Sequence, residues 1–168
     1  MSTVESKQGG ANVRIPPPLI FLVGIASGWA IDHDIQDLPM PLGRMSGLLA
    51  ATACGLMGFF LTGHALALFK QSGQEPEPWR PSPELIGKGP YRYTRNPMYV
   101  GMLLLQCAAG FALSNAWVLV LAPISLLGVH VAAVLPEERY LTHKFGAGYT
   151  DYVARTPRYL DWPSGNKA

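Results

Sequence analysis

The chain has 168 residues, of which 49% are hydrophobic and only 14% charged, and its formal net charge is +2. This length favours a single domain, and so small a net charge gives no reason to expect a nucleic-acid partner. The charges are unevenly spread, since none lies in residues 45–69 and none in residues 98–136. Uncharged stretches of this length indicate membrane-spanning helices.

The N-terminal part divides into a polar and an apolar segment. Residues 1–14 predict a polar tail, and residues 15–31 predict a transmembrane helix, with prolines 16–18 where a helix start tolerates them. The alternative is a cleaved signal peptide, whose apolar region would be of similar length. We favour a retained helix, because the preceding segment is long and contains Glu5 with few positive charges. Whether so short a helix crosses the whole bilayer stays open.

Three further spans follow along the chain. A bilayer needs roughly 20 apolar residues per helix, so residues 45–69 predict the second span. The uncharged stretch 98–136 is long enough for two more, which we place at 97–113 and 116–135, joined by a tight turn at Ser114-Asn115. The expected fold is therefore an all-α integral membrane domain over residues 1–168, with about four transmembrane helices.

The distribution of charge predicts how these helices are oriented. The loop of residues 70–95 contains five lysines and arginines, whereas the loop of residues 32–44 contains three aspartates and one arginine. Positively charged loops stay on the cytoplasmic side of a membrane. We therefore expect a multi-pass protein with the 70–95 loop and both termini in the cytoplasm.

Beyond Pro136 the sequence pattern changes. Apolar and aromatic side chains from Tyr140 to Tyr152 recur at helical spacing, with charged residues between them. This pattern is typical of an amphipathic helix at the membrane interface, which we predict over residues 137–155 with a break at Gly146–Gly148.

Two polar clusters border the last two spans. The segment Gly89–Gly101 precedes the third span, and the pair Glu137-Glu138 follows the fourth. A helical hairpin would bring both clusters to one membrane face. Asn96-Pro97 is a good helix start, and a guanidinium such as that of Arg95 beside free backbone N–H groups suits a carboxylate. The clusters predict a site for a zwitterionic ligand, although charges that simply mark helix ends are the simpler alternative.

Histidines and cysteines give weaker signals. His130 lies seven residues before Glu137 and, in a regular α-helix, would share its face. A lone membrane histidine is more often a packing residue than a catalytic one. Cys54 and Cys107 lie within predicted spans, in no spacing suited to a disulfide framework or a metal site, so we expect no metal.

Taken in order, these motifs resemble those of a known family. Residues from about Pro83 to Tyr159 resemble the isoprenylcysteine carboxyl methyltransferase family and its bacterial and phospholipid-methylating relatives. The matching features are Gly89-Pro-Tyr91, Arg95-Asn-Pro-Met-Tyr99 with Gly101, Glu137-Glu138, Lys144-Phe-Gly146 and Tyr149–Tyr152. They cover under half of the chain. The motifs in this order are specific for the family, whereas any one of them alone is not.

The resemblance implies an integral membrane methyltransferase that uses S-adenosylmethionine and a lipophilic acceptor entering from the bilayer. It also implies a place in a bacterial inner membrane, with the active site facing the cytoplasm. The residues that it assigns to the cofactor are Pro83, Glu84, Leu85, Ile86, Tyr91, Asn96, Pro97, Met98, Tyr99 and Glu137, to which we add Arg95.

The resemblance leaves the acceptor undefined. Prenylcysteine methyltransferases have a substrate-binding arginine where this chain has Ala133, and Asn96 replaces a histidine, as in relatives that methylate phospholipid amines. A carboxylate acceptor would need no general base, whereas an amine or thiol would lose a proton, for which Glu138 or His130 is a candidate. The oligomeric state is not predicted.

Two other functions fit part of the pattern. A membrane sterol-type reductase would have a similar C-terminal motif, but would need a nicotinamide cofactor and usually more spans. A non-catalytic membrane scaffold would keep the helices without turnover.

Overall fold

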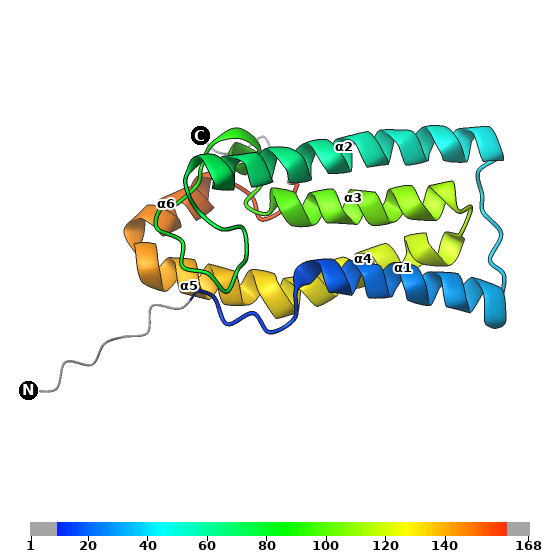
Figure 1. The fold of residues 1–168 in the computed structure, drawn as a ribbon, viewed down its shortest axis with the longest axis horizontal. Coiled ribbons are helices and arrows are strands. Elements are labelled where there is room, and N and C mark those ends of the chain that lie inside the picture. The colour runs from blue at the N-terminus through cyan, green and yellow to red at the C-terminus, as the bar shows by residue number, and fades with distance from the viewer. Residues whose placement is uncertain (1–9, 161–168) are drawn as a thin grey trace, which may run out of the picture.

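The computed structural model describes residues 10–160, which are helical without strands (Figure 1). The helices are α1 (Pro17–Asp34), α2 (Arg44–Gln71), α3 (Pro97–Ala112), α4 (Ala116–Val129), α5 (Leu135–Phe145) and α6 (Ala147–Arg155). A 3-10 turn covers Gly89–Arg92, and a π-turn, His130–Val134, joins α4 to α5. The predicted all-α class is confirmed for the described part of the chain.

Four helices run side by side along the long axis of the molecule (Figure 1). α2 packs on α3, and α1 packs on α4. The loops α1–α2 and α3–α4 lie at one end, while α5, α6 and the 72–96 loop lie at the other. Ser114, with φ of 52°, makes the predicted tight turn, and Asn115 caps α4 by accepting a hydrogen bond from the Val118 N–H at 3.0 Å.

Two of the helices in residues 10–160 are long and apolar enough to cross a membrane. They are α2 and the continuous helix Ala116–Phe145; α3 is apolar but shorter, and α1 is not among them. α1 ends in Asp32-His-Asp34, which lowers its apolar character. Large apolar side chains nevertheless stay exposed on three helices, with Leu22 at 58%, Phe59 at 71% and Leu127 at 61%. Exposed apolar faces of this extent are typical of contact with lipid.

The helix that contains the predicted span 116–135 continues to Phe145, because charged residues change the environment of a helix without ending its backbone. The π-turn ends two residues before Pro136, whose nitrogen donates no hydrogen bond to the preceding turn. Residues 137–155, for which an interfacial helix is predicted, form the end of this long helix and α6. The expected break is confirmed at Gly146, where φ is 52°.

Part of the predicted polar tail packs on the bundle: in residues 10–14, Ala11 and Val13 are buried while Asn12 and Arg14 are exposed. Residues 1–9 lie outside the described part of the chain. Ala11 and Val13 are buried in the core, and the N–H groups of Gly10 and Ala11 donate to the carbonyls of Trp79 and Pro78 at 3.0 and 2.7 Å. This segment therefore fixes the proline-rich 72–88 loop against the bundle.

Glycines allow α2 and α3 to approach closely. A Cβ on Gly101 would lie 2.3 Å from Thr62 Oγ1 and 2.9 Å from the Gly58 carbonyl oxygen, whereas a Cβ on Gly63 would meet nothing within 4 Å. We predict that Gly101→Ala destabilises the fold by about 1–3 kcal/mol through overpacking. Gly63→Ala is the matched control and should be neutral or stabilising. Thermal unfolding in detergent measures both, and equal midpoints would contradict the close approach.

Candidate functional site

The helical hairpin brings the two polar clusters together, as predicted. α3 begins at Pro97 with Asn96 in the N-cap position, and the long helix returns to the same end of the bundle with Glu137 and Glu138 (Figure 1). Tyr99, in the first turn of α3, donates its hydroxyl to Glu137 Oε1. The two acidic side chains point in different directions, because neighbours on a helix are about 100° apart.

Glu138 is held by two arginines. Arg95 Nη1 donates to Glu138 Oε1 at 2.9 Å, and Arg158 makes a bidentate pair, with Nε and Nη2 at 2.8 and 2.7 Å from the two carboxylate oxygens. The side chains of Arg95 and Glu138 are 10% and 17% exposed. Such partly buried charges need their partners, and bidentate pairing also fixes their orientation. Glu138 therefore positions Arg95 and ties the C-terminal segment to the site.

The C-terminal segment also bonds to the start of α3 through its backbone. The Arg158 carbonyl accepts from Thr94 Oγ1 at 3.1 Å and from Asn96 Nδ2 at 2.9 Å, and the Pro157 carbonyl accepts from the Arg95 N–H at 2.9 Å. The side chain of Asn96 makes no capping bond. The prediction of a helix start was right, but this amide holds the C-terminal segment.

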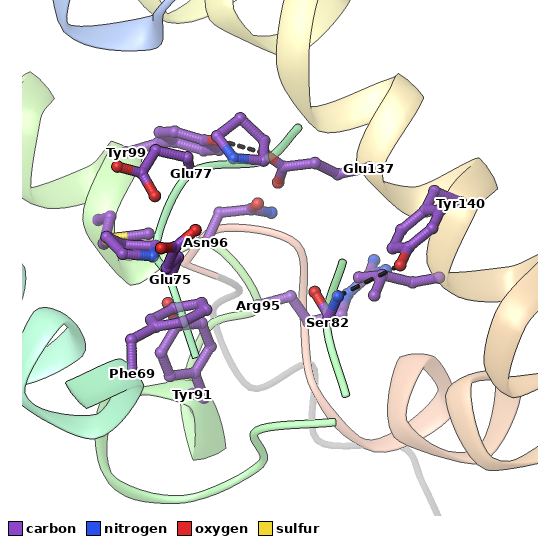
Figure 2. A pocket seen from close by; sticks show the side chains of 14 residues that line it. Phe69, Glu75, Glu77, Ser82, Tyr91, Arg95, Asn96, Tyr99, Glu137 and Tyr140 are labelled. Atoms are coloured by element: carbon purple, nitrogen blue, oxygen red, sulfur yellow. Dashed lines mark hydrogen bonds between the residues drawn. The ribbon is translucent and has the colours of Figure 1, made fainter. Parts of the chain in front are cut away.

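Two hollows with a common wall lie at this junction, and we call them together the polar cleft. They enclose about 100 and 80 Å³ and open to the outside. Both are lined by Phe69, Ser82, Tyr91, Arg95, Asn96, Glu137 and Leu141. Figure 2 shows Glu137 and Tyr140 on one side of the first hollow and the rings of Phe69 and Tyr91 on another. The cleft thus has a charged part and an aromatic part.

Tyrosines of the aromatic part stay protonated. Burial raises the pKa of Tyr91 and of Tyr152 well above the ordinary value for a phenol. The Tyr152 hydroxyl donates to the Tyr91 carbonyl at 2.6 Å, and the Phe69 and Tyr91 rings meet edge to face with centroids 6.0 Å apart. These contacts connect α2, the 3-10 turn and α6 into one rigid wall.

Some buried polar atoms of the cleft have no hydrogen-bond partner among residues 10–160. They are Arg95 Nε, Glu77 Oε2 and both amide atoms of Gln74. An unsatisfied buried donor or acceptor costs about 1–3 kcal/mol, so such groups are typical of sites that a ligand completes. A ligand in the cleft would therefore meet one unpaired guanidinium N–H, one unpaired carboxylate oxygen, and both the donor and the acceptor of a side-chain amide.

An apolar cavity of about 290 Å³ adjoins the polar cleft. It shares Pro76, Glu77, Pro78, Met98 and Tyr99 with the first hollow. The rest of its lining is Pro16, Pro17, Pro18, Leu66, Trp79 and Met102. A polar cleft and an apolar cavity therefore meet at Tyr99.

Most of the residues predicted to bind a cofactor line the polar cleft. They are Glu84, Leu85, Ile86, Tyr91, Arg95, Asn96, Met98, Tyr99 and Glu137. Pro83 instead lines a separate surface hollow with Lys144, and Pro97 is fully buried at the start of α3. Glu138 lines the smaller hollow with its carboxylate engaged by the arginines.

His130 lies elsewhere. Its Nδ1 is 2.9 Å from the Tyr159 hydroxyl, and it is not in the lining of the polar cleft. The expectation that it shares the face of Glu137 assumed a regular α-helix. The π-turn His130–Val134 changes the phase between the two residues, so their common face stays a prediction.

Sequence reasoning missed several residues of the site. Arg158 and Gln74 belong to no motif and to no periodic pattern in the sequence. Phe69 is the last residue of the predicted span 45–69, where nothing in the sequence indicates a site. Their roles depend on how α2 ends and how the C-terminal segment folds back, which are tertiary features.

Comparison with known proteins gives the family. The family model described as phospholipid methyltransferase matches residues 46–148, which is more than half of the chain. The match includes α2, α3, the long helix and the loop between α2 and α3. Neither the curated proteins nor the solved structures yield a match. The family is one of membrane methyltransferases, in agreement with the apolar helices and with the resemblance of the motifs. The chain belongs to the phospholipid methyltransferase family.

Proposed function

We propose that this protein transfers the methyl group of S-adenosylmethionine to a lipophilic acceptor in the membrane. The observation that carries the proposal is the meeting of the polar cleft and the apolar cavity at Tyr99, which also hydrogen-bonds Glu137. A soluble, charged donor and a membrane-borne acceptor must meet at such a junction. Membership of the family supports methyl transfer and a lipid substrate.

The residues of the polar cleft fit the cofactor. Its amino acid head has a carboxylate and an ammonium group, for which the Arg95 Nε donor and the Glu137 carboxylate are suitable partners. Leu85, Ile86 and Tyr91 offer an apolar and aromatic wall for the nucleoside. When bound, the cofactor supplies an electrophilic methyl group on a sulfonium. The enclosed volumes are small, so the ligand would also occupy the open mouths of the hollows.

The protein would act chiefly by alignment and by exclusion of water. Tyr99 and Met98 line both spaces, so they would orient the acceptor toward the methyl group. We propose Glu138 as a positioning residue that holds Arg95, because both of its carboxylate oxygens are already engaged by the guanidinium groups of Arg95 and Arg158. His130, bonded to Tyr159, would stabilise the C-terminal segment.

The apolar cavity would receive the hydrocarbon part of the acceptor. Glu77 lines both spaces, and its Oε2 is buried without a partner in residues 10–160. A carboxylate at that position repels an anionic acceptor and favours a group with an N–H or S–H bond. The position of Glu77 in an otherwise apolar lining, which includes Leu66 and Met102, therefore supports an amine or a thiol over a carboxylate as the reacting group of the acceptor.

We further propose four transmembrane helices, formed by α1, α2, α3 and residues 116–135, within a single domain of residues 1–168. Their side-by-side arrangement and the exposed apolar faces support this (Figure 1). The polar cleft lies at the end of the bundle that holds the basic 72–96 loop, so it would face the cytoplasm. A bacterial inner membrane is the expected location.

Isothermal titration of the purified protein in detergent with S-adenosylhomocysteine tests the proposed cofactor. We expect saturable binding at one site, whereas NADPH should give none. Binding of NADPH alone would favour the reductase alternative. A folded protein that binds neither ligand would contradict the proposed function.

A further inference from the structure

Gln74 is held at the polar cleft by the end of α2. The chain closes this helix with a Schellman motif: the Gln74 N–H donates to the Phe69 carbonyl at 2.9 Å and the Gly73 N–H to the Lys70 carbonyl at 3.2 Å. Gly73 has the required positive φ, 67°. The motif reverses the chain direction immediately before Gln74. The backbone of this residue is thus fixed although it lies in a loop.

The side chain of Gln74 is buried without a partner. The residue is 6% exposed, and neither Nε2 nor Oε1 has a hydrogen-bond partner among residues 10–160. A buried amide is ordinarily satisfied on both atoms. One that lines a cleft and offers a donor beside an acceptor suits a ligand with the complementary acceptor–donor pair on one edge.

Part of the wall around Gln74 suits a flat ring. The smaller hollow that it lines contains the aromatic and apolar side chains of Phe69, Tyr91, Leu85 and Ile86 besides the charged residues Glu84, Arg95, Glu137 and Glu138. The rings of Phe69 and Tyr91 lie away from Glu137, which belongs to the charged part of the cleft (Figure 2). The charged amino acid part of the proposed cofactor would bind near Glu137 and Arg95. The amide of Gln74 is therefore available to a different part of the same ligand.

We propose that Gln74 recognises the adenine base of the cofactor, an inference that rests on the proposed function. Its Oε1 would accept a hydrogen bond from the 6-amino group, and its Nε2 would donate to the neighbouring ring nitrogen. Glutamine and adenine form this bidentate pair in nucleic-acid complexes. Gln74 is then a specificity residue for the nucleobase, and Phe69 and Tyr91 supply the aromatic wall beside the base.

The test compares two ligands by isothermal titration: S-adenosylhomocysteine and its purine analogue that lacks the 6-amino group. The wild type should bind the amino-bearing ligand about tenfold or more tightly. Gln74→Leu should bind S-adenosylhomocysteine about tenfold or more weakly and lose the preference. Gln71→Leu, on an exposed glutamine at the end of α2, is the matched control and should keep both affinities.

The outcomes separate this proposal from the proposed function. A wild type that binds neither ligand would overturn the proposed function and this inference with it. Binding in the wild type with an unchanged preference in Gln74→Leu would overturn the role of Gln74 alone. If Gln74→Leu fails to fold, Gln74→Glu replaces it: this variant keeps an acceptor and loses the donor. It should bind both ligands more weakly and still prefer the amino-bearing one, and unchanged affinities would overturn the inference.

Discussion

Replacing Glu137 by glutamine is expected to weaken binding of S-adenosylhomocysteine by about 10- to 100-fold. Burial raises the pKa of Glu137 to about 7, so binding is compared at pH 8, where this carboxylate is mostly ionised. Hydrogen bonds to a charged group contribute about 1.5–3 kcal/mol, and Glu137→Gln removes the charge while keeping the shape and an acceptor for Tyr99. Because the fold keeps this contact, the unfolding midpoint should change little. Isothermal titration and thermal unfolding of the same preparation measure the two effects separately.

Asp34→Asn is the matched control for Glu137→Gln. Asp34 ends α1 at the opposite end of the bundle (Figure 1), so its neutralisation should leave the affinity unchanged. A general effect of net charge on binding would appear in both variants. Wild-type affinity in Glu137→Gln would remove Glu137 from the proposed cofactor site.

Replacing Glu138 by alanine is expected to destabilise the protein by about 3 kcal/mol or more. This change leaves Arg95, whose side chain is 10% exposed, without its carboxylate, and removal of one partner of a buried ion pair costs about 3–5 kcal/mol. It also removes the ion pair by which Arg158 helps to hold the C-terminal segment. Thermal or denaturant unfolding in detergent measures the loss, and weaker ligand binding should accompany it.

Two variants test whether the ion pairs of Glu138 with Arg95 and Arg158, together called the arginine network, stabilise the protein through their geometry. Arg158→Lys keeps the charge but loses the bidentate pair, so its loss of stability should be smaller than that of Glu138→Ala and still measurable. Arg155→Ala is the control, because Arg155 is exposed on α6 and donates to the Asp151 carbonyl in its own helix. Equal stability of Glu138→Ala and the wild type would show that the arginine network does not hold the C-terminal segment.

Local patterns were sufficient to predict the all-α class and the hairpin of α3 and α4. Residues 97–113 and 116–135 were located from uncharged length, and the turn between them from Ser114-Asn115. Antiparallel neighbours joined by a short turn necessarily bring their outer ends together, so the proximity of Tyr99 and Glu137 followed from topology. The different directions of the Glu137 and Glu138 side chains followed from the helical repeat.

Features that depend on distant packing were not predictable in this way. The burial of Ala11 and Val13 depends on pairing with Pro78 and Trp79, which no periodicity shows. The π-turn His130–Val134 interrupts the regular helix, and no periodicity of the sequence marks it. Gln74 acquires its position only because α2 ends in a Schellman motif. The feature that singles it out is a buried amide without a hydrogen-bond partner in residues 10–160, which a sequence does not show.

Transfer of a labelled methyl group tests the central proposal most directly. The purified protein is incubated with methyl-labelled S-adenosylmethionine and a total lipid extract in detergent, and the lipid fraction is then counted. The proposed function predicts label in a lipid with the wild type and a large loss with Glu137→Gln. A folded wild type that binds S-adenosylhomocysteine but labels no lipid, or equal labelling by the Glu137→Gln variant, would contradict it.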